Sequence, residues 1–158
     1  MTGKFAAGFI VISAAIAGFA IYYLQVYAFY TEASFTPGRE IVLTTIETGQ
    51  PEPILAEDVT GIDAESSPLR FRACFTTPLT QAMLSETYVA YEGAEPLVAP
   101  GWFDCFDAVE IGTALERGEA LAFLSQANVH ADVDRVVAVF PDGRAFAWTQ
   151  FNPAAKDE

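Results

Sequence analysis

An uninterrupted apolar run near the N-terminus constrains this chain more than any other feature. Phe5 to Tyr30 reads FAAGFIVISAAIAGFAIYYLQVYAFY and contains no charged residue. An α-helix rises about 1.5 Å per residue, so about 20 apolar residues cross the roughly 30 Å hydrocarbon core of a bilayer. We therefore predict a transmembrane anchor over residues 1–30, with the remainder of the chain held at a membrane surface.

A cleaved signal peptide is the alternative to an anchor. Ala15-Ile16-Ala17 has the small-x-small form that signal peptidase requires, and it follows a short n-region that contains Lys4. The apolar run continues past Ala17, however, so cleavage there would leave a strongly apolar new N-terminus. The length of the run favours the uncleaved anchor.

The distribution of positive charge predicts the orientation of the anchor. Lys4 and the N-terminal amine precede the run, whereas the next basic residue is Arg39, well beyond its end. Positive charge collects on the cytoplasmic side of a membrane span. We expect a bacterial inner-membrane protein with a cytoplasmic N-terminus and a periplasmic domain.

Two sets of residues within the run suggest contacts of the helix. Tyrosine suits the headgroup region, which predicts a membrane-interface group made of Tyr22, Tyr23, Tyr27 and Tyr30. A stripe of small residues permits close packing against the helix of an integral membrane protein, and it consists of Gly3, Ala7, Ala14 and Gly18. The alternative for the stripe is ordinary membrane-helix composition, since Ala and Gly are common there.

Beyond the run, the chain has room for one domain of ordinary size. We predict a linker over residues 31–40, an α+β domain over residues 41–152 and a loose tail over residues 153–158. The domain should contain an antiparallel sheet and two short helices. The predicted strands are Ile41 to Glu47, Ile54 to Ile62, Leu69 to Thr76, Ala120 to Ser125, Asp134 to Phe140 and Arg144 to Phe151.

Turn and cap residues mark the other elements of the domain. Pro141-Asp142-Gly143 predicts a hairpin between the last two strands. One helix should run from Pro78 to Tyr88, capped by Thr77 and facing inward with Leu79, Met83 and Ala82. The other should run from Ala108 to Arg117, capped by Asp107 and ended by Gly118. Alternation places Leu69, Phe71, Ala73 and Phe75 on one strand face, opposite Arg70, Arg72 and Cys74.

The two cysteines, Cys74 and Cys105, both fall in the predicted outer compartment. An even count in an oxidising space indicates a disulfide. The alternative is a redox or metal-binding pair, although reactive cysteines are usually closer in sequence. The single histidine, His130, stands near Asp132 and Asp134 without the spacing of a calcium loop. No catalytic motif is present, and we expect a non-enzymatic protein with no cofactor and no metal.

Acidity is the strongest bulk property of the domain. All 21 Asp and Glu residues follow the apolar run, but only seven of the eight Lys and Arg residues do, which gives a net charge of −14 there. Such a surface repels nucleic acid and anionic headgroups. It would attract a basic partner such as a c-type cytochrome, or simply keep the domain soluble and away from the membrane.

The motifs resemble those of a known family. MTGKF and YYLQVYAFY at the start, RFRACFTTPL and GWFDCFDA in the middle, and the late DRVVAVFPDGRAFAW are similar to a family of small single-span alphaproteobacterial proteins whose domain has unknown function. The resemblance implies an inner-membrane protein with a periplasmic domain and implies no reaction. Some members carry a histidine-kinase label, but this sequence has no Gly-rich nucleotide motif and only one histidine.

Three functional classes follow. The first is a non-enzymatic accessory or assembly protein that docks on a larger membrane complex, for which a respiratory complex linked to cytochrome c is our example. The second is a periplasmic binding or sensing module whose pocket lies near Trp102. The third is a redox or metallochaperone protein that uses Cys74 and Cys105. The absence of a catalytic motif, the single span and the small-residue stripe favour the first class.

Overall fold

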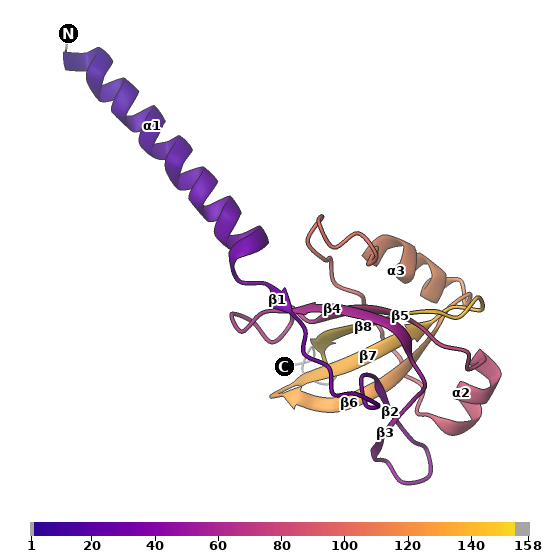
Figure 1. The fold of residues 1–158 in the computed structure, drawn as a ribbon. Helices are drawn as coiled ribbons and strands as arrows, with labels where there is room; N and C mark the ends of the chain where they lie inside the picture. Colours follow the sequence, from indigo (N-terminus) through magenta and orange to yellow (C-terminus); the bar gives the residue numbers. More distant parts are fainter. Residues whose placement is uncertain (1, 154–158) are drawn as a thin grey trace. The chain divides into compact units, whose positions relative to one another are not determined.

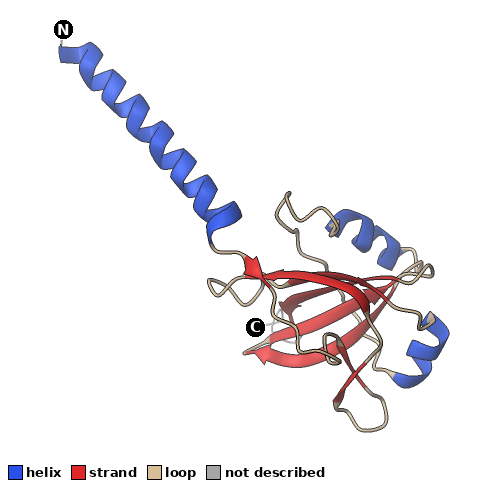
Figure 2. Cartoon of the chain, viewed as in Figure 1, coloured by secondary structure: helices blue, strands red, loops and turns tan. Residues whose placement is uncertain are grey.

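A computed structural model describes residues 2–153, which form two units (Figure 1). The first unit ends at Tyr30 and is helical, whereas the second begins at Thr31 and contains all the strands. Figure 2 shows that the second unit combines an antiparallel sheet with two short helices. The α+β class predicted from the sequence is therefore confirmed.

The first unit is one long apolar helix. α1 (Thr2–Tyr23) continues into a π-helical turn, η1 (Leu24–Ala28). Within residues 2–153, Gly3–Ala28 is the one helix that is long and apolar enough to cross a membrane, and its most apolar part is not buried within the chain. A signal sequence near the N-terminus has the same properties, so a membrane span and a signal sequence both fit this helix.

The π-helical turn rearranges the tyrosines at the end of the helix. It brings the ring centroids of Tyr22 and Tyr27 to 6.2 Å and stacks Tyr23 on Tyr27 at 6.0 Å. Tyr30 lies beyond the helix, and its N–H contacts the Tyr27 carbonyl oxygen at 3.4 Å. Three of the four predicted interface tyrosines therefore share the helix end, whereas Tyr30 follows it, because the wide turn terminates the regular α-helical spacing.

A six-stranded antiparallel sheet forms the centre of the domain. Its edges are β1 and β6, and its middle is the β5–β8–β7 group. In spatial order the strands are β1 (Thr31–Glu32), β4 (Glu57–Asp63), β5 (Arg72–Thr76), β8 (Arg144–Phe151), β7 (Val133–Val139) and β6 (Leu121–His130). A separate two-stranded sheet consists of β2 (Val42–Thr44) and β3 (Pro51–Pro53).

The β7–β8 hairpin is the most regular part of the sheet. Its turn is closed by hydrogen bonds from the Phe140 N–H to the Arg144 carbonyl oxygen and from the Gly143 N–H back to Phe140. Gly143 has a φ of 90°, and a Cβ there would lie 2.8 Å from the Thr77 carbonyl oxygen. Glycine is needed at this position for both reasons. The hairpin predicted from Pro141-Asp142-Gly143 is confirmed.

Both faces of the sheet are covered, and alternate residues of its central strands enter two cores. In Figure 1, α3 (Ala108–Glu116) covers one face, whereas α2 (Gln81–Thr87) and the β2–β3 sheet lie on the other. Val137 and Ala147 face the core that contains Leu43 and Leu84. The neighbouring residues Val136 and Trp148 face the core that contains Ile111. Full burial of such side chains contributes roughly 1.5 to 3 kcal/mol each.

Because both faces of the sheet are covered, the side of β5 that carries Arg72 is buried and does not face solvent. Arg72, predicted to lie opposite the apolar face, is almost completely buried. Its guanidinium donates hydrogen bonds of 2.6 to 2.8 Å to the carbonyl oxygens of Leu69, Phe71 and Leu97, and one of 3.2 Å to that of Val98. A buried cation needs such acceptors, so Arg72 ties the loop before α3 to the sheet.

The two helices agree with their predictions to different degrees. α3 begins at its predicted Asp107 cap, whose carboxylate accepts hydrogen bonds from the N–H groups of Val109 and Glu110. α2 is shorter than predicted and is capped by Thr80, not by Thr77. Met83 and Ala82 are exposed, and Leu84 is the buried residue of this helix. The inward face predicted for Met83 and Ala82 is therefore wrong, whereas Leu79 does pack against the core.

The predicted linker over residues 31–40 contributes to the domain. β1 pairs with β4, and the ring of Phe35 contacts Phe71 edge-on at 6.4 Å between centroids. Gly61 lies so close to the Phe35 ring that a Cβ there would approach it to 2.7 Å. The predicted linker is therefore ordered against the sheet. β3 lies outside the strands predicted from the sequence, and its prolines fit an edge strand.

Candidate functional site

The two cysteines are joined in a disulfide, as predicted. Cys74 on β5 and Cys105 in the loop before α3 have Cα atoms 6.3 Å apart. Cys74 is buried in the core beside Phe106 and Trp148. Neither sulfur is therefore available as a thiolate, which a redox nucleophile or a metal site would require.

The acidic residues near His130 have structural roles. Asp134 is buried, and its carboxylate accepts hydrogen bonds from the Tyr91 hydroxyl at 3.0 Å and from the Asn128 N–H at 2.9 Å. Asp132 has a φ of 60° in the turn between β6 and β7. Among residues 2–153, no group of three or more His, Cys, Asp or Glu side chains is arranged to hold a metal ion.

Trp102 does not line any of the larger pockets of the domain. Its ring contacts Phe103 edge-on at 6.4 Å, and the side chain is partly exposed. A hollow of about 280 Å³ lies beside this loop, but Val98, Phe103 and Phe106 line it instead of Trp102. The buried tryptophan is Trp148, and its alternation with Phe146 on β8 is a sequence signal that could have predicted this burial.

A groove of about 570 Å³ lies beside α3, and we call it the α3 groove. Small and apolar side chains line most of it, including Tyr91, Pro96, Leu115 and Ala122. A Cβ on Gly112 would lie 3.6 Å from the Pro96 ring, which is an ordinary contact distance, so the helix and the loop lie close together here. The groove has the size of a small-molecule site, and Ser85, Glu92, Glu95 and Glu116 add polar groups to its lining.

Side-chain hydrogen bonds hold the loop that forms one wall of the α3 groove. The Gln150 amide accepts from the Glu95 N–H at 2.8 Å and donates to the Gly93 carbonyl oxygen at 3.1 Å. The Tyr91 N–H donates to the Ala122 carbonyl oxygen on β6. Burial and the hydrogen bond to Asp134 raise the pKa of the Tyr91 hydroxyl, so this hydroxyl stays protonated as a donor.

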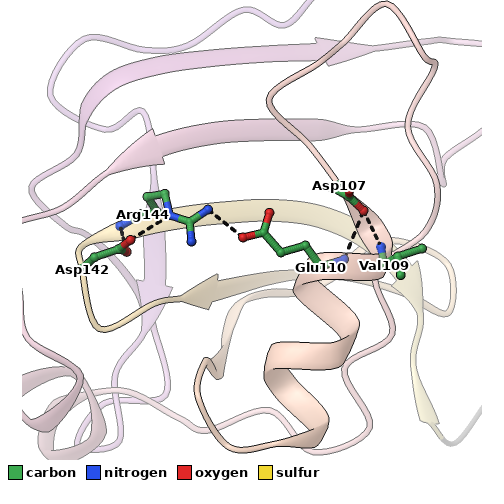
Figure 3. Close-up of polar contacts among 5 residues, drawn as sticks. All are labelled: Asp107, Val109, Glu110, Asp142 and Arg144. Atoms are coloured by element: carbon green, nitrogen blue, oxygen red, sulfur yellow. Dashed lines mark hydrogen bonds and ion pairs between the residues drawn. The ribbon is translucent and has the colours of Figure 1, made fainter.

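Figure 3 shows an ionic contact on the domain surface. Arg144 donates to Asp142 at 2.8 Å and to Glu110 at 2.9 Å. The hydrogen bond from Arg144 lowers the pKa of the Asp142 carboxyl. All three side chains are about half exposed, and exposed ion pairs contribute little to stability. The contact links the β7–β8 turn to the start of α3 and is structural.

The small residues predicted for helix packing lie on an exposed part of α1. Gly3, Ala7, Ala14 and Gly18 are all exposed, and a Cβ added at Gly3 or Gly18 would meet nothing within 4 Å. The spacing places the four residues on one side of the helix. Nothing in the described chain packs on this stripe, so its role in contact with a partner remains a prediction.

Comparison with known proteins identifies a family without assigning a reaction. A family model described as a family of unknown function (DUF6446) matches residues 41–158. The chain belongs to this family. The family match covers the domain from Ile41 onward and does not include α1. Membership in a family of unknown function was expected from the motifs, whereas the alphaproteobacterial source stays a prediction. No curated protein and no solved structure matches the chain.

Proposed function

We propose that this chain is a non-enzymatic accessory or assembly protein that docks on a larger complex of a bacterial inner membrane. The observation that carries the proposal is the helix Gly3–Ala28, whose apolar surface is left exposed by the rest of the chain. Lipid or the helix of another protein must cover such a surface in water. The domain adds an acidic surface for a partner outside the membrane.

The domain belongs on the periplasmic side in this proposal. The disulfide between Cys74 and Cys105 supports an oxidising compartment. Lys4 before the span, and the lack of a Lys or Arg after it until Arg39, fit the positive-inside rule. A domain with a net charge of −14 would favour encounter with a basic partner, for which a c-type cytochrome of a respiratory complex is the example.

A periplasmic binding or sensing module is the second candidate, and the α3 groove favours it. Its volume of about 570 Å³ lies in the range of small-molecule sites. This groove replaces the Trp102 loop as the location for such a module. A redox or metallochaperone function is the weakest candidate, because both cysteine sulfurs are joined to each other.

Docking through the helix is tested by a paired substitution on the small-residue stripe. Ala14→Leu with Gly18→Leu keeps the helix apolar but holds a neighbouring helix away, since small residues permit close approach. We expect the amount of co-purified partner to fall by about fivefold or more, from losses of about 1 to 2 kcal/mol for such contacts. The measurement is affinity purification from native membranes in mild detergent, with partners quantified by mass spectrometry.

The matched control is Ala20→Leu, which makes a small-to-large change away from the stripe. The control should co-purify partners like the unsubstituted protein, and membrane levels of both variants should be equal. Undiminished co-purification by the Ala14 and Gly18 variant would contradict docking through the stripe. If salt then released the partner, binding would run through the acidic domain, because salt screens exposed charges.

A further inference from the structure

A polar pocket of about 430 Å³ lies between the segment 36–42, β3, β6 and β7, and we call it the Arg135 pocket. It shares no lining residue with the α3 groove. Phe71 and Ala147 form a buried apolar floor. Side chains with hydrogen-bonding groups, including Gln50 and Gln126, lie around it and are exposed. The pocket therefore combines an apolar base with a polar surround, as small-ligand sites commonly do.

Arg135 is the central cation of this pocket. It lies in the middle of β7, paired in register with Gln126 on β6 and Thr149 on β8. Its guanidinium carbon is 4.0 Å from the centroid of the Phe71 ring, which holds the flat group in a defined place. The Nε atom is buried and has no hydrogen-bond partner within the described chain. A buried N–H without an acceptor is unfavourable, so an external acceptor would be stabilising here.

The charge around Arg135 favours an anion of low charge. Burial lowers the pKa of the Arg135 guanidinium, and the negative charge of Asp63 acts in the opposite direction. No carboxylate among residues 2–153 lies within ion-pair distance of Arg135 or of Arg39, which also lines the pocket. Glu40 is the one acidic lining residue, and its carboxylate accepts a hydrogen bond from the Gly38 N–H. Asp63 does not line the pocket, so its lining residues, two arginines and one glutamate, carry a net charge of +1 in a strongly acidic domain.

We propose that the Arg135 pocket binds a small organic monocarboxylate. The planar guanidinium presents paired donors that match a carboxylate, and arginine remains charged even when it is partly buried. The apolar part of the ligand would contact the buried floor of the pocket. A single negative charge balances the local charge of +1, whereas Glu40 disfavours a doubly charged phosphate. A small cation would be repelled by both arginines.

The test uses the whole chain in detergent micelles and benzoate as the probe. Nitrogen–proton NMR reports directly on the Arg135 Nε–Hε group, so binding is read at the proposed contact. We expect saturable shifts of this signal with benzoate, at least about tenfold weaker binding of inorganic phosphate, and no shift with benzamide, which has the same ring but no charge. If the chemical shift of the Arg135 Nε–Hε signal does not change up to the solubility limit of benzoate, the proposal is overturned.

Two arginine substitutions test whether benzoate affinity depends on Arg135 or only on the overall charge of the protein. Arg135→Met keeps the apolar stem and removes the guanidinium, so benzoate affinity should fall by about tenfold or more. Arg117→Met removes an exposed arginine elsewhere and should leave affinity unchanged, which controls for net charge. Equal losses in both variants would show that benzoate responds only to overall charge and would overturn the site. The NMR signal of the unsubstituted protein keeps the test decisive if Arg135→Met fails to fold.

Discussion

Replacing Cys74 and Cys105 together by alanine is expected to lower the free energy of unfolding of the domain by about 3 to 4 kcal/mol. The two residues are separated by 31 positions, so the crosslink removes many conformations from the unfolded chain. The bond also fixes the loop before α3 against β5, beside the buried Phe106. Denaturant titration of the whole chain in detergent, followed by tryptophan fluorescence, measures the loss.

Reduction of the unsubstituted protein is the control for this variant. It removes the crosslink and keeps both sulfur atoms, so it separates the crosslink from the packing of the buried Cys74 side chain. Reduced protein and the alanine variant should unfold at similar denaturant concentrations. A loss of less than about 1 kcal/mol in both would contradict a stabilising role for the disulfide.

Trp148→Ala should cost about 3 to 5 kcal/mol, because truncation of a fully buried aromatic side chain removes apolar burial and leaves a cavity. The indole also packs edge-on against Phe106 at 6.3 Å between centroids. Its Nε1–H donates to the Gln150 side-chain oxygen at 2.9 Å, and that amide holds the loop beside the α3 groove. Far-ultraviolet circular dichroism during thermal and denaturant unfolding measures the loss without relying on tryptophan emission.

Trp102→Ala is the matched control, since Trp102 is partly exposed. It should change the free energy of unfolding by less than about 1 kcal/mol. Losses of less than about 1 kcal/mol in both variants would mean that Trp148 has no larger structural role than Trp102. That result would contradict the assignment of Trp148 to the core.

Patterns with a strong local cause were predicted correctly. The apolar run is long enough to specify a single helix, and Asp107 caps α3 through its own side chain. Gly143 allows the tight hairpin turn. The disulfide followed from the cysteine count and the expected compartment, and the bond joins two elements that flank the same core.

Features that depend on distant residues were missed. Residues 31–35 look like a linker because they are polar and short, and only the pairing of β1 with β4 orders them. β6 extends to His130 beyond the predicted Ser125, because register shifts accommodate its polar second half. Both faces of β5 are buried, and the face that carries Cys74 is buried because α3 covers it.

The Arg135 pocket could not be predicted from the sequence, because it also depends on residues that are distant in the chain. Its lining comes from six separate stretches of the chain, and Arg135 stands in an otherwise β-rich run, DRVVAVF. An arginine in such a run usually suggests the exposed face of a strand. Only the fold places it over Phe71 and in the same pocket as Arg39.

The intact mass of the protein from fractionated native cells, alkylated without reductant, tests the membrane-anchor account most directly. We predict a membrane-bound chain that retains Lys4 to Tyr30 and carries no alkyl group, because both cysteines are joined. A soluble chain that begins at Gly18 would show cleavage after Ala17 and contradict the anchor. A membrane-bound chain alkylated at Cys74 and Cys105 would contradict the disulfide and the periplasmic location of the domain.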